Sequence, residues 1–204
     1  MIEYLKLYLV LETKMLKVPL EEFIPAVIKG GVTCIQLRDK GRSSWEQFFV
    51  GQKVMKLLEG TDTLFVMNDR ADIAATLGAK AVHLGAKDIP LADAKRIFPG
   101  NIYGYSCNNM DDINTAELAD YIGVGPAFPT DTKADLRGLL SPEDIKALVA
   151  AANKPAVAIG GITKDNISKL NGIGLSGVAV SSAICASDDP YTAAKELWEL
   201  ADKL

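Results

Sequence analysis

Short apolar segments alternate with helix-like segments eight times along this chain of 204 residues, and this alternation constrains the fold more than any other feature. The apolar segments predict strands, the sixth beginning at Tyr121 and the others at Leu7–Leu11, Thr33–Arg38, Leu64–Asn68, Ala81–Gly85, Ile102–Ser106, Ala156–Gly160 and Val178–Ser181. The intervening segments predict helices at Leu20–Lys29, Trp45–Leu58, Arg70–Leu77, Leu91–Ile97, Asp111–Ala119, Pro142–Ala152, Asp165–Leu170 and Tyr191–Ala201. Such a chain is expected to form a parallel sheet covered by helices.

The number of units and the chain length favour one form of parallel α/β fold over the other. Eight units in 204 residues fit a single (β/α)8 TIM barrel, near the lower size limit for that fold. A doubly wound open sheet, the main alternative, usually has fewer strands in this length, and the sequence has no Gly-x-Gly-x-x-Gly after its first strand. Because no linker or low-complexity segment interrupts the pattern, we expect one barrel domain over residues 1–204.

Alternate side chains of a strand point to opposite faces of a sheet, so their parity separates the two sides of each strand. In the second strand Ile35 and Leu37 share one parity, and Cys34, Gln36 and Arg38 share the other. We assign the aliphatic parity to the helix-facing side and the small or polar parity to the barrel interior.

The same rule assigns Val157, Ile159, Val178 and Val180 of the last two strands to the helix-facing side. The polar residues of inward parity stand at the last inward position of their strands: Arg38, Asn68, Ser106 and Ser181. In a barrel these positions surround the C-terminal mouth, where active sites are built.

Charge and cysteine content exclude several classes of protein. The net charge is −4, so we expect neither nucleic acid nor an anionic membrane as a partner. Cys34, Cys107 and Cys185 are odd in number and widely spaced, which argues for a reducing compartment. The N-terminal residues lack the pattern of a signal peptide, and Leu7–Leu11 is too short for a membrane span. We therefore expect a cytoplasmic protein.

The segment Gln36–Lys40 ends the second strand with two cations two residues apart. Arg38 offers paired donors and Lys40 a point charge, which together suit a diphosphate. The structural alternative is an ion pair between a strand-end cation and Asp39.

Carboxylates follow the third and fourth strands. Asp69 comes directly after Asn68, and Asp88 lies in the loop after Gly85. Two carboxylates on neighbouring loops suit Mg²⁺, which binds through one or two carboxylates, water and substrate phosphate. The structural alternatives are a helix N-cap for Asp69 and a turn residue for Asp88.

The last two strands are followed by loops that suit phosphate. Gly160 and Gly161 follow the seventh strand, and Ser181 and Ser182 follow the eighth. Barrel enzymes often bind phosphate in these two loops, where glycine lets backbone amides approach the ligand. The alternative for the glycine pair is a tight turn.

The sixth strand leads into an irregular segment that ends at Asp135. Gly123 and Gly125 share the inward parity, and the chain then breaks at Pro126 and Pro129 before a run of threonines, one lysine and two aspartates. This composition suits an anion-binding segment that closes over the site, and an exposed connector is the alternative.

Protein nucleophiles and zinc ligands find little support in the sequence. His83 is the only histidine, and we expect it to be packed and hydrogen-bonded. No Gly-x-Ser-x-Gly or Cys-x-x-Cys motif is present, and the cysteines are expected to be buried apolar residues. The chemistry should therefore depend on electrostatics and positioning.

Six motifs, in the same order along the chain, resemble those of the thiamine-phosphate synthase family: Gly31–Lys40, Asn68–Arg70, Val82–Gly85, Gly123–Lys133, Ala158–Ile162 and Val180–Ile184. The resemblance implies a (β/α)8 barrel that joins an aminopyrimidine diphosphate to a thiazole phosphate, releasing thiamine phosphate and diphosphate. It also implies a dissociative reaction, in which a pyrimidine-methyl cation forms before the thiazole nitrogen captures it. Such a reaction needs leaving-group stabilisation and exclusion of water.

The resemblance further implies roles for single residues. The diphosphate would be held by Arg38, Lys40, Asn68 and Lys133, the pyrimidine by Gln36 and Ser106, and the thiazole phosphate by Thr130, Thr132, Gly161, Ser181 and Ser182. Asp69 and Asp88 would bind Mg²⁺, and the catalytic residues would be Arg38, Lys40, Ser106 and Lys133. The partners would be small phosphorylated substrates, and the sequence leaves the oligomeric state open, a homo-oligomer included.

Two positions depart from the family pattern. Ala86 stands where the family usually has glutamine, and Asn108 stands where it commonly has histidine. A thiazole tautomerase of the same fold is the nearest alternative function, and it would need a proton-transferring histidine at position 108. A non-catalytic barrel that binds thiamine phosphates is a further alternative.

Overall fold

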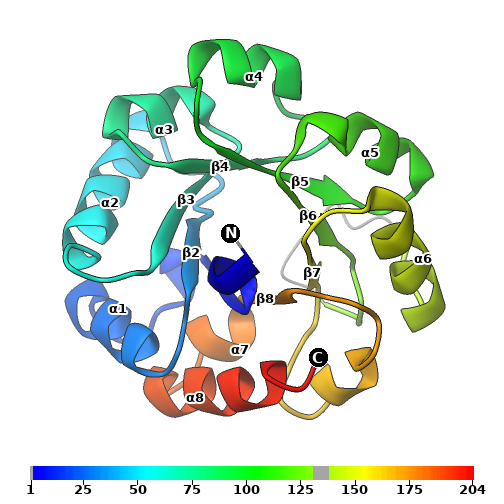
Figure 1. The fold of residues 1–204 in the computed structure, drawn as a ribbon. Helices are drawn as coiled ribbons and strands as arrows, with labels where there is room; N and C mark the ends of the chain where they lie inside the picture. The colour runs from blue at the N-terminus through cyan, green and yellow to red at the C-terminus, as the bar shows by residue number, and fades with distance from the viewer. Residues whose placement is uncertain (1, 131–137) are drawn as a thin grey trace.

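The computed structural model of the protein describes residues 2–130 and 138–204. Eight parallel strands form a closed barrel in which each strand pairs with its neighbours in chain order and β8 pairs with β1. The predicted (β/α)8 barrel is confirmed, and Figure 1 shows it along its axis. The strands are β1 Leu7–Leu11, β2 Cys34–Leu37, β3 Leu64–Asn68, β4 Ala81–Leu84, β5 Ile102–Cys107, β6 Tyr121–Val124, β7 Ala156–Ile159 and β8 Gly177–Val180.

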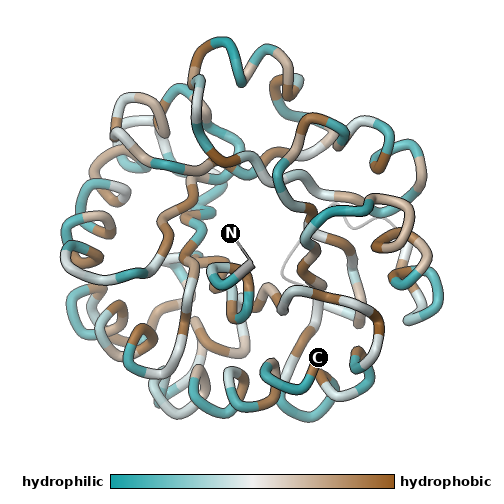
Figure 2. Tube along the Cα trace, in the orientation of Figure 1, coloured by the Kyte–Doolittle hydropathy of each residue, from teal (hydrophilic) through white to brown (hydrophobic). Residues whose placement is uncertain are grey.

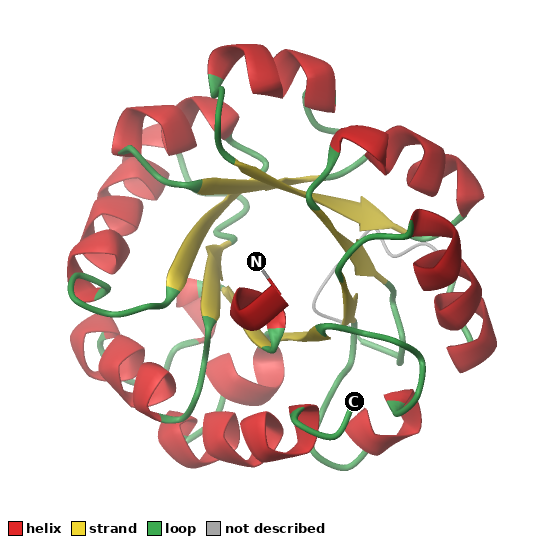
Figure 3. Cartoon of the chain, in the orientation of Figure 1, coloured by secondary structure: helices red, strands yellow, loops and turns green. Residues whose placement is uncertain are grey.

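Helices form a ring outside the strands (Figures 1 and 3). They are α1 Leu20–Lys29, α2 Ser44–Leu57, α3 Ala71–Leu77, α4 Leu91–Ile97, α5 Met110–Thr115, α6 Pro142–Ala152, α7 Ser182–Cys185 and α8 Pro190–Ala201, with short 3-10 helices at Ile2–Leu5, Thr13–Met15, Ala116–Leu118 and Ile167–Leu170. No helix in the described part of the chain is both long enough and apolar enough to span a membrane.

One predicted helix is shorter than expected, one is wrong in type, and α7 was not predicted. The helix expected at Asp111–Ala119 is α5 followed by a 3-10 turn, and the one expected at Asp165–Leu170 is a 3-10 turn over Ile167–Leu170. The second segment contains Asn166 and Ser168, whose side chains compete for backbone hydrogen bonds and lower helix propensity. The other predicted bounds agree with the structure or differ from it by one residue, within the usual uncertainty at element ends.

The predicted parity is right for β2 and β8 and wrong for β7. Val157 packs in the barrel interior with Ile159 beside it, whereas Ala156 and Ala158 belong to the layer between strands and helices. Val157 pairs in register with Gly123 of β6, which has no side chain to fill the interior at that level. The larger side chain therefore fills the space that the glycine leaves.

The N-terminal residues close one end of the barrel. The first 3-10 helix lies at the centre of the ring in Figure 1, and the fully buried Leu5 packs with the interior cluster. A Cβ atom on Gly177, at the start of β8, would overlap the carbonyl oxygen of Leu5, so this contact requires glycine. Figure 2 shows the apolar strands inside and hydrophilic residues along the outer helices. The opposite end of the barrel stays open and contains the cavity described next.

Candidate active site

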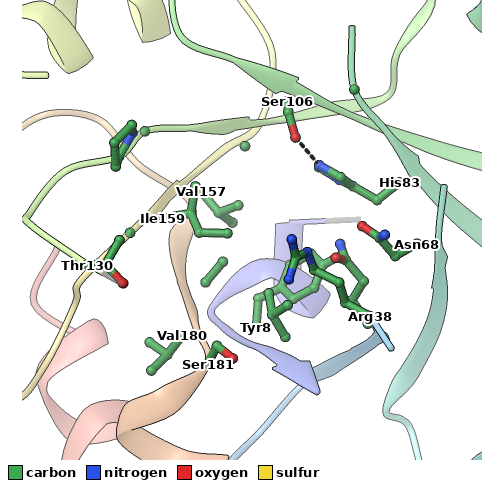
Figure 4. Close-up of a pocket in the computed structure, with 18 of the residues that line it drawn as sticks. Tyr8, Arg38, Asn68, His83, Ser106, Thr130, Val157, Ile159, Val180 and Ser181 are labelled. Atoms are coloured by element: carbon green, nitrogen blue, oxygen red, sulfur yellow. Dashed lines mark hydrogen bonds between the residues drawn. The ribbon is translucent and has the colours of Figure 1, made fainter. Parts of the chain in front are cut away.

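A cavity of about 260 Å³ lies at the C-terminal ends of the strands. Every strand, or the loop that follows it, contributes to its wall. The lining contains eleven of the predicted site residues: Gln36, Arg38, Lys40, Asn68, Asp69, Asp88, Ser106, Thr130, Gly161, Ser181 and Ser182. Ser182 is the first residue of α7. Figure 4 shows Arg38, Asn68, Ser106, Thr130 and Ser181 around this space.

A buried carboxylate holds Arg38 in this wall. Glu12 follows β1, its side chain is 3% exposed, and its Oε1 accepts a hydrogen bond of 2.6 Å from Arg38 Nη1. Lys14 Nζ lies 3.1 Å from Glu12 Oε2. Sequence reasoning missed Glu12, although it continues the inward parity of Tyr8 and Val10 by one more step. The signal that could have identified Glu12 is a charged residue at an inward-facing position.

The sequence left open that Asp39 forms an ion pair with Arg38, but in the structure Asp39 has another role. Its carboxylate accepts hydrogen bonds from Thr13 N at 2.7 Å and from the Thr13 hydroxyl at 2.5 Å. Arg42 Nε lies 3.1 Å from the same carboxylate. Asp39 therefore fastens the loop after β1 to the loop after β2, and Arg38 is left to Glu12 and the cavity.

Lys40, Asp69 and Asp88 form a charged cluster after β2, β3 and β4. Lys40 Nζ lies 3.0 Å from Asp69 Oδ2. Asp69 has φ of 61°, a left-handed conformation that is uncommon for residues other than glycine. The N-cap of α3 is Arg70, so the capping role considered for Asp69 is wrong. Asp88 Oδ2 accepts a hydrogen bond of 2.7 Å from Gly85 N, so Asp88 is a turn residue that also faces the cluster.

The Asp88 carboxyl group has a perturbed pKa. Burial, followed by the charge of Asp69 and a hydrogen bond between the two side chains, raises the pKa of Asp88 to about 6. The hydrogen bond from Gly85 N and the charge of Lys40 act in the opposite direction. Two adjacent carboxyl groups that resist simultaneous ionisation form a site where a cation would be favourable.

The donor set of this cluster fits Mg²⁺ better than a softer metal. Asp69 and Asp88 supply hard oxygen donors, and residues 2–130 and 138–204 contain no group of three or more His, Cys, Asp or Glu side chains placed to share a metal ion. A metal held by two carboxylates keeps other positions for water and for substrate oxygens, which is the usual coordination of Mg²⁺. The residues present therefore fit the predicted magnesium site.

Hydrogen bonds connect Ser106, on β5, to the barrel interior. Its Oγ lies 2.9 Å from His83 Nε2, the contact drawn in Figure 4, and His83 Nδ1 lies 3.1 Å from the Tyr121 hydroxyl. Tyr121 and Tyr8 hydroxyls are 2.8 Å apart, and Gln36 Nε2 donates to Tyr8 at 2.7 Å. His83 is packed and hydrogen-bonded, as predicted, but it lines the cavity, which sequence reasoning did not foresee.

The loops after β7 and β8 carry backbone and hydroxyl groups to the opposite wall. Gly160 has φ of 102° and Gly161 φ of 61°, and a Cβ atom on Gly161 would overlap the carbonyl oxygen of Pro129. Ser181 Oγ is buried and has no hydrogen-bond partner in the described part of the protein. The tight turn considered as the alternative for the glycines is thus present after β7, and the Ser181 hydroxyl lies after the neighbouring strand β8.

Comparison with known proteins identifies the family. A family model described as thiamine monophosphate synthase matches residues 7–184. The chain is 39% identical over 199 residues to the thiamine-phosphate synthase of Archaeoglobus fulgidus, covering 97% of this chain and 94% of that protein.

The chain belongs to the thiamine monophosphate synthase family.

Two further relatives of this family agree over almost the whole chain. The thiamine-phosphate synthase of Pyrococcus abyssi is 36% identical, covering 99% of this chain and 97% of that protein. The structure of thiamine phosphate pyrophosphorylase from Pyrococcus furiosus superimposes with a TM-score of 0.89 at 34% identity, covering 98% of this chain and 97% of that one. As a member of this family, the protein is an enzyme of the transferase class.

The structure gives a role to one of the two departures from the family pattern. Asn108 Nδ2 donates to Gly125 O at 2.9 Å and to Gly138 O at 3.0 Å. It therefore joins the end of β5 to both ends of the segment between β6 and α6. Ala86 lines the cavity, where it has no polar group to offer.

Part of the predicted site lies outside the described residues. Thr132 and Lys133 fall in the segment 131–137, so their predicted contacts and the predicted closing of the segment over the mouth stay predictions. Thr130, directly before it, lines the cavity of this synthase-family member.

Proposed function

We propose that the protein catalyses the thiamine-phosphate synthase reaction. In this reaction 4-amino-2-methyl-5-pyrimidinylmethyl diphosphate and a thiazole phosphate give thiamine phosphate and diphosphate. The observation that carries the proposal is one cavity lined by charged groups after β2, β3 and β4 and, on the opposite wall, by glycines and serines after β7 and β8. A substrate pair with an anionic group at each end fits this distribution, and family membership supports the same reaction.

The wall formed by β2 and β3 would hold the diphosphate. Arg38 keeps donors beyond the one given to Glu12, and Lys40 brings an ammonium group next to Asp69. Negative charge on a leaving diphosphate grows as the carbon–oxygen bond breaks, so fixed cations stabilise the transition state more than the ground state. The thiazole nitrogen is itself the nucleophile in this scheme, so the hydrogen bond between Ser106 and His83 has no serine nucleophile to activate.

Asp69 and Asp88 would hold Mg²⁺ in this scheme. When bound, Mg²⁺ would neutralise charge on the diphosphate oxygens. The adjacent Lys40 contributes a further positive charge to the same region. The raised pKa of Asp88 belongs to the metal-free pair, and a divalent cation would favour the ionised form of both carboxyl groups.

The opposite wall would hold the thiazole phosphate. Gly161 allows a close backbone approach, Ser181 Oγ has no partner among the described residues, and Thr130 adds a hydroxyl at the mouth. Ser182 lies beside Ser181, and the roles of Thr132 and Lys133 are proposed from the family pattern alone. The pyrimidine would then lie between the two walls, against Gln36 and Ser106.

A coupling assay tests the proposal. The purified protein, incubated with both phosphorylated halves and Mg²⁺, should form thiamine phosphate and diphosphate. Arg38→Ala should lower turnover by about 100-fold or more, the usual loss when a transition-state charge contact is removed, with an unchanged circular dichroism spectrum. A yield no higher than that of a metal-free control would contradict the proposal.

The two alternative functions predict different assay results. A thiazole tautomerase would isomerise the carboxythiazole phosphate without any pyrimidine, but both N–H groups of the Asn108 amide are donated to backbone carbonyls and an amide does not transfer protons at neutral pH. A binding protein would show tight calorimetric binding of thiamine phosphate and no turnover. The carboxyl pair of Asp69 and Asp88 favours the synthase over a binding protein, which needs no metal for a leaving group.

The cellular setting is proposed on fewer observations. Cys34, Cys107 and Cys185 are free and buried, which agrees with a reducing, cytoplasmic compartment. The proposed partners are small phosphorylated substrates, and the net charge of −4 gives no support to nucleic acid binding.

A further inference from the structure

A chain of hydrogen bonds crosses the barrel interior from β2 to β5 and ends at the cavity on both sides. It runs from Gln36 through Tyr8, Tyr121 and His83 to Ser106, with distances of 2.7, 2.8, 3.1 and 2.9 Å. Tyr8 and Tyr121 are fully buried, and all but Tyr121 line the cavity. Gln36 and Ser106 are the two residues proposed to contact the pyrimidine.

The barrel is built to allow this chain. His83, Gly104 and Tyr121 are neighbours in register across β4, β5 and β6. A Cβ atom on Gly104 would overlap both the His83 imidazole and the Tyr121 ring, so only glycine lets the two side chains meet across β5. The contact between His83 and Tyr121 therefore requires glycine at position 104.

The chain has a direction that follows from its first member. Gln36 Nε2 donates to the Tyr8 oxygen. The next three contacts, Tyr8 to Tyr121, Tyr121 to His83 and His83 to Ser106, are compatible by distance with either partner as donor. A buried hydroxyl proton without an acceptor is costly, and within this chain the Tyr8 proton finds its acceptor in the Tyr121 oxygen. The chain is then satisfied when Tyr121 donates to His83 Nδ1 and the imidazole proton on Nε2 is donated to Ser106 Oγ. The burial that raises the pKa of both tyrosines keeps these hydroxyl protons in place.

The direction of the chain decides what each end offers to a ligand. Ser106 already accepts a hydrogen bond from His83, so its own proton is available as a donor to the cavity. At the other end the Gln36 amide is oriented by Tyr8, and its Oε1, which makes no hydrogen bond within the described structure, is available as an acceptor. One end of the chain thus donates and the other accepts.

We propose that Tyr8, Tyr121 and His83 are positioning residues that fix Gln36 as an acceptor and Ser106 as a donor, and thereby select a 4-aminopyrimidine over its 4-oxo counterpart. An aminopyrimidine has an amino group that donates and ring nitrogens that accept, which matches the two ends of the chain. In the 4-oxo counterpart a carbonyl acceptor replaces the amino donor and meets Gln36 Oε1. The selectivity part of this inference rests on the proposed function, but the direction of the chain does not.

The first test measures the direction of the chain without any substrate. His83 is the only histidine in the sequence, so ¹⁵N-labelled histidine gives one pair of ring-nitrogen signals. Two-bond nitrogen–proton correlation spectra of the wild-type protein should show the proton on Nε2. A proton on Nδ1, or on both nitrogens at neutral pH, would overturn the inference.

The second test measures selectivity in the coupling assay. The wild-type protein should prefer the amino substrate over the 4-oxo analogue by about 100-fold or more in kcat/KM, because a mismatched polar group is left unpaired. Tyr121→Phe breaks the chain at its centre and should lower this ratio by about tenfold, the order expected for one misdirected hydrogen bond. It should also mix the two His83 tautomers.

Tyr103→Phe is the matched control. Tyr103 is a buried tyrosine of β5 whose hydroxyl donates to Ala94 O and Phe98 O, outside the cavity. Its loss should leave the substrate ratio and the His83 tautomer unchanged. An equal ratio in Tyr121→Phe and wild type would overturn the inference. Absence of coupling with the expected Nε2 tautomer would overturn the proposed function and the selectivity while leaving the direction of the chain established.

Discussion

The buried carboxylate of Glu12 decides where the Arg38 guanidinium lies. The two side chains are 3% and 14% exposed, and the pair stands at the edge of the cavity. The Glu12 carboxylate lowers the net positive charge of the cavity wall around Arg38. Its contribution to the enzyme is therefore to orient the guanidinium. Only a residue that fixes one N–H of the guanidinium leaves the others in a defined direction.

Glu12→Ala and Glu12→Gln separate orientation from charge. Glu12→Ala leaves Arg38 without its partner, and we expect kcat/KM for the diphosphate substrate to fall by about tenfold to 100-fold, as when a positioned contact is lost. Glu12→Gln keeps an oxygen that accepts from Nη1 and should retain most of the activity. Asp188→Ala, which breaks the exposed pair of Lys17 and Asp188, is the control and should have no effect. Equal losses in the two Glu12 variants would show that charge matters more than orientation.

Asp88 makes the stability of the metal-free protein dependent on pH. Its pKa in the folded protein is about 6, above that of an aspartate in an unfolded chain. The stabilisation that this group gives is therefore fully present below about pH 4 and is lost as the pH rises through about 6. We expect Asp88→Asn, which cannot ionise, to raise the melting temperature at about pH 7.5 relative to wild type and to have a smaller effect at about pH 4.

The measurement is thermal unfolding in chelator-treated buffer at both pH values. Asp188→Asn is a suitable control because Asp188 is exposed and pairs with Lys17 at the surface. If the melting temperatures of Asp88→Asn and wild type differ by the same amount at both pH values, Asp88 does not titrate in this range.

The segment between β6 and α6 is held at its base by side-chain and backbone hydrogen bonds. Asn108 reaches from β5 to Gly125 O and Gly138 O, and Leu140 N donates to Pro126 O at 3.0 Å. These bonds fix where the segment leaves and rejoins the barrel. A primary amide is suited to this place because one nitrogen donates to two acceptors.

Asn108→Asp should damage the site more than the fold. The carboxylate would face two carbonyl oxygens without a proton to donate, so we expect KM for the thiazole phosphate to rise by about tenfold, the order of one lost hydrogen bond with an added repulsion. Asn101→Asp is the matched control, because the Asn101 amide also donates to two carbonyls, Phe98 O and Pro99 O, away from the cavity. Equal changes in KM for the two variants would contradict a role of Asn108 in the site.

The sequence predicts the barrel well because strand-like and helix-like segments alternate without interruption. It predicts the residues at the mouth because the last inward position of a strand has a defined direction. It fails for β7, where Val157 faces inward because Gly123 on the neighbouring strand leaves room for it. Pairing across strands cannot be read from one strand alone. The same limit explains why Glu12 and the Tyr8–Tyr121–His83 chain were missed, since each depends on contacts between distant strands.

The cavity depends on all eight strands, so ligand binding should stabilise the barrel as a whole. We expect inorganic diphosphate with Mg²⁺ to bind only the folded state, so that at about 100 times its Kd it should add about 2.7 kcal/mol to the free energy of unfolding. For a barrel of this size that corresponds to an increase of roughly 5–10 °C in melting temperature. Diphosphate without metal should give a smaller increase, because in the proposed scheme only Arg38 and Lys40 would then hold it.

The double variant Asp69→Asn/Asp88→Asn tests which part of this increase belongs to the carboxyl pair. It should retain the shift given by diphosphate alone and lose the additional shift given by Mg²⁺, because the pair that would hold the cation is gone. If the variant keeps the full magnesium-dependent shift, the cation binds elsewhere on the barrel. If wild type shows no shift with diphosphate at all, the wall formed by β2 and β3 is not the diphosphate site.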